Sequence, residues 1–275
     1  MNRRPTARRL LPVLVLSAGL VLTACSSGGD SSSATTTTQA PKTLRIVVTN
    51  DDGYDSAGID AVIQALKAEP DVEITVVAPA TQQSGKGGQV TGGTLTATDL
   101  KSKSGFPVKA VAGTPADSMI WALDQKGISF TPDLVVSGVN AGANLGPVID
   151  VSGTVGAARA AVQRNIPAIA ASNGAISGPF VPVEAATVVV EWFRQNRAAI
   201  ADGTIDRTQV FNLNVPTCAT GSVRGRLDVP ITTTDTSFLT QQPNCTSTAT
   251  NPANDVAAYM IGYSALSKIP ARPAS

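Results

Sequence analysis

Two carboxylates stand side by side where an apolar stretch of the sequence stops. The run at 46–48 has the character of a buried strand, and three residues later the chain reaches Asp51 and Asp52. Two like charges about 4 Å apart repel by roughly 4 kcal/mol near a protein surface. A solvated turn in front of a helix would tolerate the pair, and so would a cation bound before both carboxylates.

A second group of polar residues follows another apolar run. The amides of Asn140 and Asn144 come first, and Ser152, Gly153 and Thr154 then open a helical pattern. Free backbone N–H groups at the start of a helix favour a bound phosphate or other anion. A hydroxyl that acts only as a helix cap would explain the same residue types.

The chemistry open to these residues is limited because the chain contains no histidine. This absence excludes Ser-His-Asp and Cys-His catalysis, an imidazole base and the usual zinc ligands. Oxygen ligands favour a hard cation instead, namely Mg²⁺, Mn²⁺ or Ca²⁺. Such a cation would offset the repulsion between Asp51 and Asp52. Together with an anion-binding helix start, it predicts hydrolysis of a phosphate ester by metal-activated water.

Apolar runs rich in β-branched residues alternate with amphipathic helical patterns along most of the chain, and the alternation predicts a doubly wound α/β fold. Continuous apolar strands indicate a mainly parallel sheet with helices on both faces. Strands are expected at 44–49, 72–79, 107–113, 132–140, 166–172 and 208–216, and helices at 57–69, 115–126, 153–165 and 182–199.

Three polar loops follow these strands, at 49–56, 79–93 and 137–154. In a doubly wound sheet the ligand site lies beyond the carboxyl ends of the strands. We therefore expect the three loops to meet at one edge of the sheet and to form the site there.

The first 42 residues predict export. Four arginines precede a short apolar stretch at 10–22, which is the pattern of a signal peptide over 1–24. Leu-Thr-Ala-Cys at 22–25 resembles the bacterial lipobox, in which Cys25 would carry a lipid; an ordinary secretory signal is the alternative. The small polar residues that complete 25–42 predict a flexible tether. We expect a lipid-anchored protein of the bacterial cell envelope, on the extracytoplasmic side of the membrane.

One large domain is expected over 43–270, followed by a tail at 271–275. Without the signal peptide, 17 of the 21 basic residues remain against 20 acidic ones. No basic patch stands out, which argues against a nucleic-acid polymer as partner. Cys218 and Cys245 remain as a pair, and in an exported chain they predict a disulfide, with two free thiols as the alternative.

Five segments resemble, in order and approximate spacing, the signature blocks of the SurE family of metal-dependent 5′/3′-nucleotidases. These segments are VTNDDGYDSAGI, VVAPATQQSGKG, VAGTPADS, PDLVVSGVNAGANLG and SGTVGAA. The resemblance runs from about residue 43 to 216, and a weaker match returns at 254–270.

This resemblance implies a role for each matching residue. The family's metal ligands, which hold one divalent cation per subunit, fall on Asp51, Asp52, Ser84 and Asn140. Its phosphate-binding residues fall on Asn144, Ser152, Gly153 and Thr154. The implied reaction is hydrolysis of nucleoside 5′- or 3′-monophosphates, with Asp51 or Asp52 as the base.

The chain also departs from the family pattern. Ser118 stands where the family has a cysteine, and Lys86 follows Ser84-Gly85 where small polar residues are common. The arm at 216–254 is shorter than the arm that builds dimers and tetramers in the family, so a homodimer is possible but not required.

Three other functions are alternatives to a nucleotidase. A broad-specificity extracytoplasmic acid phosphatase would share every metal ligand. A lipid-anchored protein that binds a phosphorylated solute without turnover would not need an open metal site. A phosphoaspartate enzyme would need Asp-x-Asp after the first strand, but Asn50 lies two residues before Asp52.

Overall fold

The computed structural model describes residues 42–174 and 179–272. The predicted signal peptide, the lipidation site Cys25 and nearly all of the predicted tether lie outside these residues, as do the last three residues of the predicted tail. Among the helices of the described ranges, none is long and apolar enough to cross a membrane.

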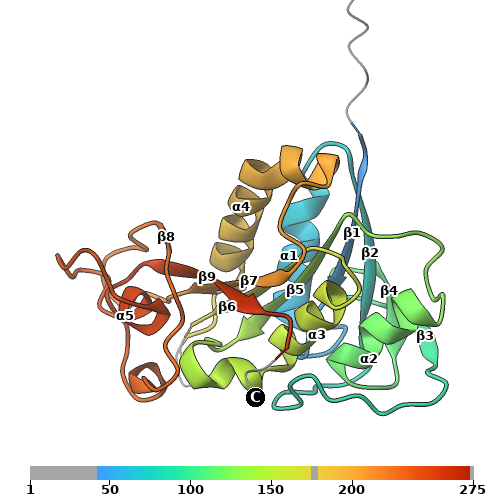
Figure 1. Cartoon of the computed structure of the whole chain (residues 1–275), viewed down its shortest axis with the longest axis horizontal. Coiled ribbons are helices and arrows are strands. Elements are labelled where there is room, and N and C mark those ends of the chain that lie inside the picture. Colours follow the sequence, from blue (N-terminus) through green and yellow to red (C-terminus); the bar gives the residue numbers. More distant parts are fainter. Residues whose placement is uncertain (1–41, 175–178, 273–275) are drawn as a thin grey trace, which may run out of the picture. The chain divides into compact units, whose positions relative to one another are not determined.

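One nine-stranded sheet organises the described part of the chain, in the order β3-β4-β2-β1-β5-β6-β7-β9-β8 (Figure 1). Strand β3 is antiparallel to β4, and β9 is antiparallel to β7, whereas the other neighbours are parallel. The strands are β1 Leu44–Thr49, β2 Val72–Pro79, β3 Ala97–Lys101, β4 Pro107–Val111, β5 Leu134–Ala141, β6 Ala168–Asn173, β7 Gln209–Val215, β8 Arg226–Asp228 and β9 Ser264–Pro270.

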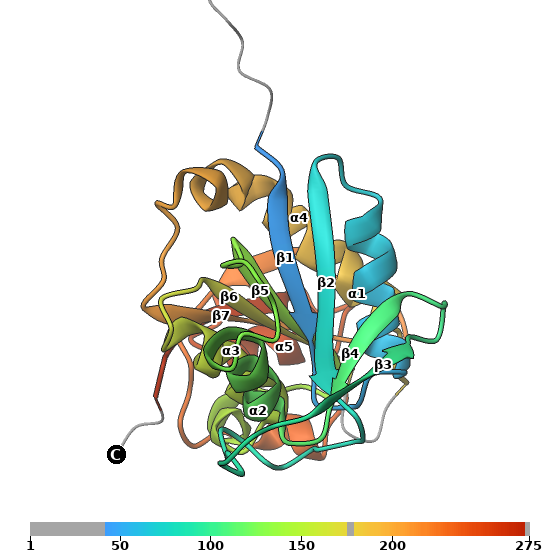
Figure 2. The same ribbon diagram turned by 90° about the vertical axis from the view of Figure 1, so that its right-hand side faces the viewer.

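Helices cover both faces of this sheet (Figures 1 and 2). On one face α1 and α4 pack against Val48 and Val136, and on the other α2 and α3 pack against Val47 and Val135. Successive strand residues point to opposite faces, and helices cover both faces. Apolar residues are therefore buried at every position, and the strands appear in the sequence as continuous apolar runs. The helices are α1 Ala57–Lys67, α2 Pro115–Met119 with a π-helical turn at Ile120–Asp124, α3 Gly153–Val162, α4 Pro182–Asp202 and α5 Asp255–Met260.

The predicted doubly wound α/β fold is therefore confirmed. Strands β3 and β8 were not expected, for different reasons. Residues of β3 are mostly exposed and show no apolar pattern, and β8 is only three residues long. Both strands lie at an edge of the sheet, where pairing needs little burial.

The order of the strands changes direction at β1, which lies between β2 and β5. Strands β2, β3 and β4, which follow β1 in the sequence, lie on one side of it, and all later strands lie on the other side. A crevice outside the carboxyl ends of β1 and β5 is the usual ligand site at such a switch point. Asp51 and Asp52 follow β1, and Asn140 lies near the end of β5.

The arm at 216–254 contains β8 and a short 3₁₀ turn at Ser237–Leu239. A disulfide joins Cys218 to Cys245, with a Cα–Cα distance of 5.7 Å. Phe238 of the arm packs with Leu145 and Tyr259 in a separate apolar cluster. The arm thereby supports the loop between β5 and α3.

Candidate active site

Asp51 connects the three predicted loops. Its side chain is 2 % exposed, and its Oδ1 accepts a hydrogen bond from the hydroxyl of Thr154 at 2.5 Å. Its backbone carbonyl accepts one from the N–H of Gln83 at 2.7 Å. The loop after β1, the loop after β2 and the first turn of α3 are thus held together at the carboxyl edge of the sheet.

The two carboxylates lie in a setting that disfavours negative charge. Burial raises the pKa of Asp51 above its usual value, although the Thr154 hydroxyl and nearby N–H groups act in the opposite direction. For Asp52, burial and then the charge of Asp51 raise the pKa to about 6, against a weaker lowering by the N–H of Ala141. A bound cation would reverse both effects, because it favours the ionised carboxylates.

The start of α3 faces Asp51. The N–H groups of Gly153 and Thr154 favour the ionised form of the Asp51 carboxyl and so oppose the larger effect of burial on its pKa. A Cβ added to Gly153 would lie 2.8 Å from Cβ and Oδ2 of Asp51. Glycine is therefore needed at this position so that the helix start can approach the carboxylate.

Both predicted phosphate-binding hydroxyls of α3 already have partners inside the protein. Ser152 is the N-cap, and its Oγ accepts from the N–H of Val155 at 3.1 Å. Thr154 donates to Asp51, as described above. The sequence motif therefore serves as a helix cap and as a clamp on a carboxylate, while the O–H of Ser152, which only accepts in the cap, and the backbone N–H groups at the helix start remain suited to an anion.

Asn140 lies beside Asp52. Its Nδ2 donates to the carbonyl of Gly142 at 2.7 Å, which engages the donor end of the amide. The N–H of the next residue, Ala141, donates to Oδ2 of Asp52 at 3.3 Å. The side-chain oxygen of Asn140 is the atom that this residue can offer to a cation.

Ser84 lies on the exposed loop after β2. Its hydroxyl accepts a hydrogen bond from the side chain of Gln82, and its N–H donates one to the same side chain. The residue between them, Gln83, donates its N–H to the backbone carbonyl of Asp51. Among the described residues, no hydrogen bond joins Ser84 itself to either aspartate. The structure therefore places Ser84 on the loop that Gln83 ties to Asp51.

The loop that carries Ser84 is fixed to α3 farther along. The N–H of Gly87 donates to the carbonyl of Val151 at 3.0 Å. A Cβ added to Gly156 would lie 1.9 Å from the carbonyl oxygen of Gly87, so the two backbones are in direct contact. This contact limits how far the loop can move from the start of the helix.

Asn144, the fourth predicted phosphate-binding residue, is 5 % exposed and bonds to β6 and β7. Its partners are Ser172, Asn212 and Asn214. None of the three was singled out in the sequence. Their signal was present, because Asn212 and Asn214 are two amides on one face of an otherwise apolar strand.

Comparison with known proteins assigns the family. A family model described as "Survival protein SurE" matches residues 46–238. The chain belongs to the SurE family. A 5'-nucleotidase SurE of Treponema pallidum is 47% identical over 131 residues, which cover 47% of this chain and 68% of the relative. A 5'-nucleotidase SurE of Pelobacter propionicus is 40% identical over 184 residues, 66% of this chain and 69% of the relative.

The fold agrees with that of a solved SurE structure. The SurE protein from Aquifex aeolicus superposes with a TM-score of 0.65 at 26% sequence identity, over 84% of this chain and 95% of that one. The resemblance to SurE that the sequence blocks indicated is confirmed, and it extends over most of the described residues.

The donors of this SurE site fit a hard cation. Among the described residues there is no group of three or more His, Cys, Asp or Glu side chains that could hold a metal ion. Two adjacent carboxylates with raised pKa, an amide oxygen and a hydroxyl on a nearby loop are ligands for Mg²⁺, Mn²⁺ or Ca²⁺ rather than for zinc.

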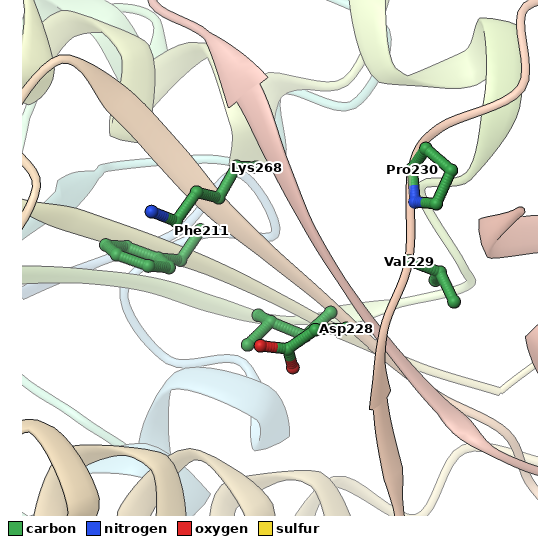
Figure 3. A pocket seen from close by; sticks show the side chains of 6 residues that line it. Phe211, Asp228, Val229, Pro230 and Lys268 are labelled. Carbon is green, nitrogen blue, oxygen red and sulfur yellow. The ribbon is translucent and has the colours of Figure 1, made fainter.

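A separate cavity of about 290 Å³ opens beside β7, β8 and β9 (Figure 3). Phe211, Leu266 and Lys268 line it from β7 and β9, and Asp228 lines it from β8. No predicted site residue takes part in its wall. This cavity is therefore separate from the candidate site at the carboxyl edge of the sheet.

Proposed function

We propose that this protein is a phosphomonoesterase that hydrolyses nucleoside 5′- or 3′-monophosphates to nucleoside and phosphate. The observation that carries the proposal is the pair of neighbouring carboxylates in front of the first turn of α3, of which Asp51 is buried and Asp52 is half-buried. Relatives that bear the name 5'-nucleotidase support the nucleotide as substrate.

In this proposal one divalent cation is held by Asp51, Asp52, Ser84 and Asn140. When bound, it would polarise the phosphoryl group and lower the pKa of the attacking water. Ser84 would contribute its hydroxyl from the loop after β2, which the N–H of Gln83 ties to the carbonyl of Asp51.

The two aspartates have different tasks. Asp51 is buried and fixed by Thr154, so it serves as an oriented, permanent ligand. Asp52 is the less buried of the two, which makes its carboxylate the better placed to accept the proton of the attacking water. The backbone N–H groups at the start of α3, together with Asn144, would bind the phosphoryl oxygens.

The test is phosphate release from a panel of nucleoside monophosphates, with Mg²⁺, Mn²⁺ or Ca²⁺ and with a chelator. Hydrolysis should need a divalent cation, and Asp52→Asn should abolish most turnover while the circular-dichroism spectrum and the melting temperature stay near those of the wild type. Chelator-insensitive hydrolysis by Asp52→Asn would contradict the metal mechanism.

The same panel separates the other functions. Equal rates on nucleotides and on simple aryl phosphates would favour a broad-specificity phosphatase. Tight binding of phosphate esters without release of phosphate, under every metal condition, would favour a binding protein.

A further inference from the structure

Three buried polar side chains form a floor beneath the loop between β5 and α3. We call Ser172 of β6 and Asn212 and Asn214 of β7 the polar floor. All three are 0 % exposed. Asn214 is in register with Ser172, and Asn212 lies two residues earlier on the same face of β7. This face is the one that packs against α3, because Val210 belongs to the α3 cluster.

The polar floor converges on a single residue, Asn144. The N–H of Asn144 donates to Oδ1 of Asn214 at 2.7 Å. Its carbonyl accepts from Nδ2 of Asn212 at 2.9 Å and from Nδ2 of Asn214 at 3.1 Å. Its side-chain Nδ2 donates to Oγ of Ser172 at 2.9 Å. Both the main chain and the side chain of Asn144 are therefore fixed to the sheet.

Fold stability alone does not account for Asn212. Its Oδ1 is buried without a hydrogen-bond partner among the described residues. An unpartnered buried acceptor destabilises the folded state, and an apolar side chain of similar size would avoid that loss. What Asn212 supplies is its donor, and that donor is directed at Asn144.

We propose that Asn212 and Asn214 are positioning residues that hold Asn144 in the geometry that binds the phosphoryl group. The inference rests on the proposed function, because it takes Asn144 as a phosphate contact. The Nδ2 group of Asn144 carries two hydrogens, and Ser172 accepts only one of them. The other is the donor that would bind a phosphoryl oxygen. Because the side chain is fixed before the substrate arrives, this donor loses no freedom on binding and contributes more to affinity than a mobile one.

The test compares four single variants: Asn144→Ala, Asn212→Leu, Asn214→Leu and the control Ser267→Ala. Ser267 is opposite Asn212 in the register of β7 and β9 and is 2 % exposed, but its hydroxyl donates to the carbonyl of Val229 in the arm. It therefore reports the effect of removing a buried polar group that does not reach Asn144.

Asn212→Leu should raise the KM for a nucleoside monophosphate and the inhibition constant of inorganic phosphate about tenfold, equivalent to one lost hydrogen bond. Its kcat should stay within about threefold of the wild type, and Ser267→Ala should change neither constant. In the Asn144→Ala background, Asn212→Leu should add little, because both changes remove the same contact. Unchanged KM, or effects that multiply in the double variant, would overturn the proposal.

Amide hydrogen exchange tests the positioning step without any turnover. Exchange at the N–H of Asn144 should be faster in Asn214→Leu and unchanged in Ser267→Ala, and equal rates in all three proteins would overturn the proposal. If Asn214→Leu does not fold, Asn212→Leu carries the test, since it also removes the unpartnered oxygen. A wild type that binds inorganic phosphate without hydrolysing any nucleotide, and that loses this binding in Asn212→Leu, would overturn the proposed function and support the positioning role.

Discussion

The hydroxyl of Thr154 donates to Oδ1 of Asp51 at 2.5 Å, and the two residues are separated by 103 positions in the sequence. One hydrogen bond thus joins the first turn of α3 to the loop after β1. It orients a buried carboxylate and favours its ionised form, which is the form that a cation binds.

Thr154→Ala should therefore weaken binding of the divalent cation, by about tenfold, because the ionised Asp51 loses its donor. Thr154→Ser keeps the hydroxyl and should retain most of the affinity. Isothermal titration with Mn²⁺ measures both variants. From the sequence alone, Thr154 was expected to matter more for phosphate, and a variant that loses phosphate binding but keeps cation affinity would restore that role.

Gly153→Ala should disrupt the site with little effect on the helix. The added Cβ would lie 2.8 Å from Oδ2 of Asp51 and must displace the carboxylate or the start of α3. We expect kcat/KM to fall by about 100-fold, since the loss of oriented binding groups has effects of this order. Gly88→Ala is the matched control, because a Cβ there meets no atom within 4 Å. Equal activity of both variants would show that the close approach is not needed.

Asp60, which lies outside the proposed site, should make the stability of the protein depend on pH. Burial would raise its pKa, but the hydroxyls of Ser102 and Ser104, the N–H of Ser104 and the charge of Lys103 together lower it below 3.8. A carboxyl group whose pKa is lower in the folded than in the unfolded state stabilises the protein at pH values above its unfolded-state pKa. This contribution is lost as the pH falls through the folded-state pKa.

The Asp60→Asn variant should therefore be less stable than the wild type near pH 6, and the difference should shrink as the pH falls from about 5 to about 2. Urea unfolding at a series of pH values measures this. A difference that stays constant with pH would mean that the ionised carboxylate adds nothing.

The Cys218–Cys245 disulfide should stabilise the arm. It closes a loop with a sequence separation of 27, and in the chain-entropy model such a loop adds about 3 kcal/mol. Replacing both cysteines with serine should lower the free energy of unfolding by about this amount. Turnover well below the melting temperature should be retained, because neither cysteine belongs to the proposed site. An unchanged free energy of unfolding would contradict the role.

Attachment to the membrane is tested at Cys25. Cys25→Ala should release the protein from the membrane fraction or leave its signal peptide uncleaved, because the residue that would carry the lipid is absent. Ser26→Ala changes the neighbouring residue and should fractionate like the wild type. Unchanged membrane partitioning of Cys25→Ala would contradict the lipid anchor expected from the sequence.

The parts of the fold that are apolar on both faces could be predicted from sequence, because their pattern follows directly from burial. The run at β5, with Val135 and Val136 facing opposite helix layers, is an example. Strand β3 could not be predicted in this way, since it is mostly exposed and is fixed by its pairing with β4.

The residue types near Asp51 and Asp52 pointed to the carboxyl edge of the sheet, where hydrogen bonds join Asp51 to Gln83 and Thr154. Their contacts did not follow from the types. A hydroxyl at a helix start can bind an anion, cap the helix or bind a carboxylate, and only the packing of α3 against the loop of Asp51 decides between these roles for Ser152 and Thr154. Two amides on one face of an apolar strand mark Asn212 and Asn214 as unusual, but the local pattern does not show which loop covers β7 and therefore which residue they hold.

The position of Lys42 has a consequence for how substrate reaches the enzyme. Lys42 lies two residues before β1, whereas Asp51 and Asp52 follow this strand, so the chain enters the domain at one edge of the sheet and the proposed site lies at the opposite edge (Figure 2). A substrate molecule that reaches the proposed site therefore does not have to pass the point where the preceding chain joins the domain.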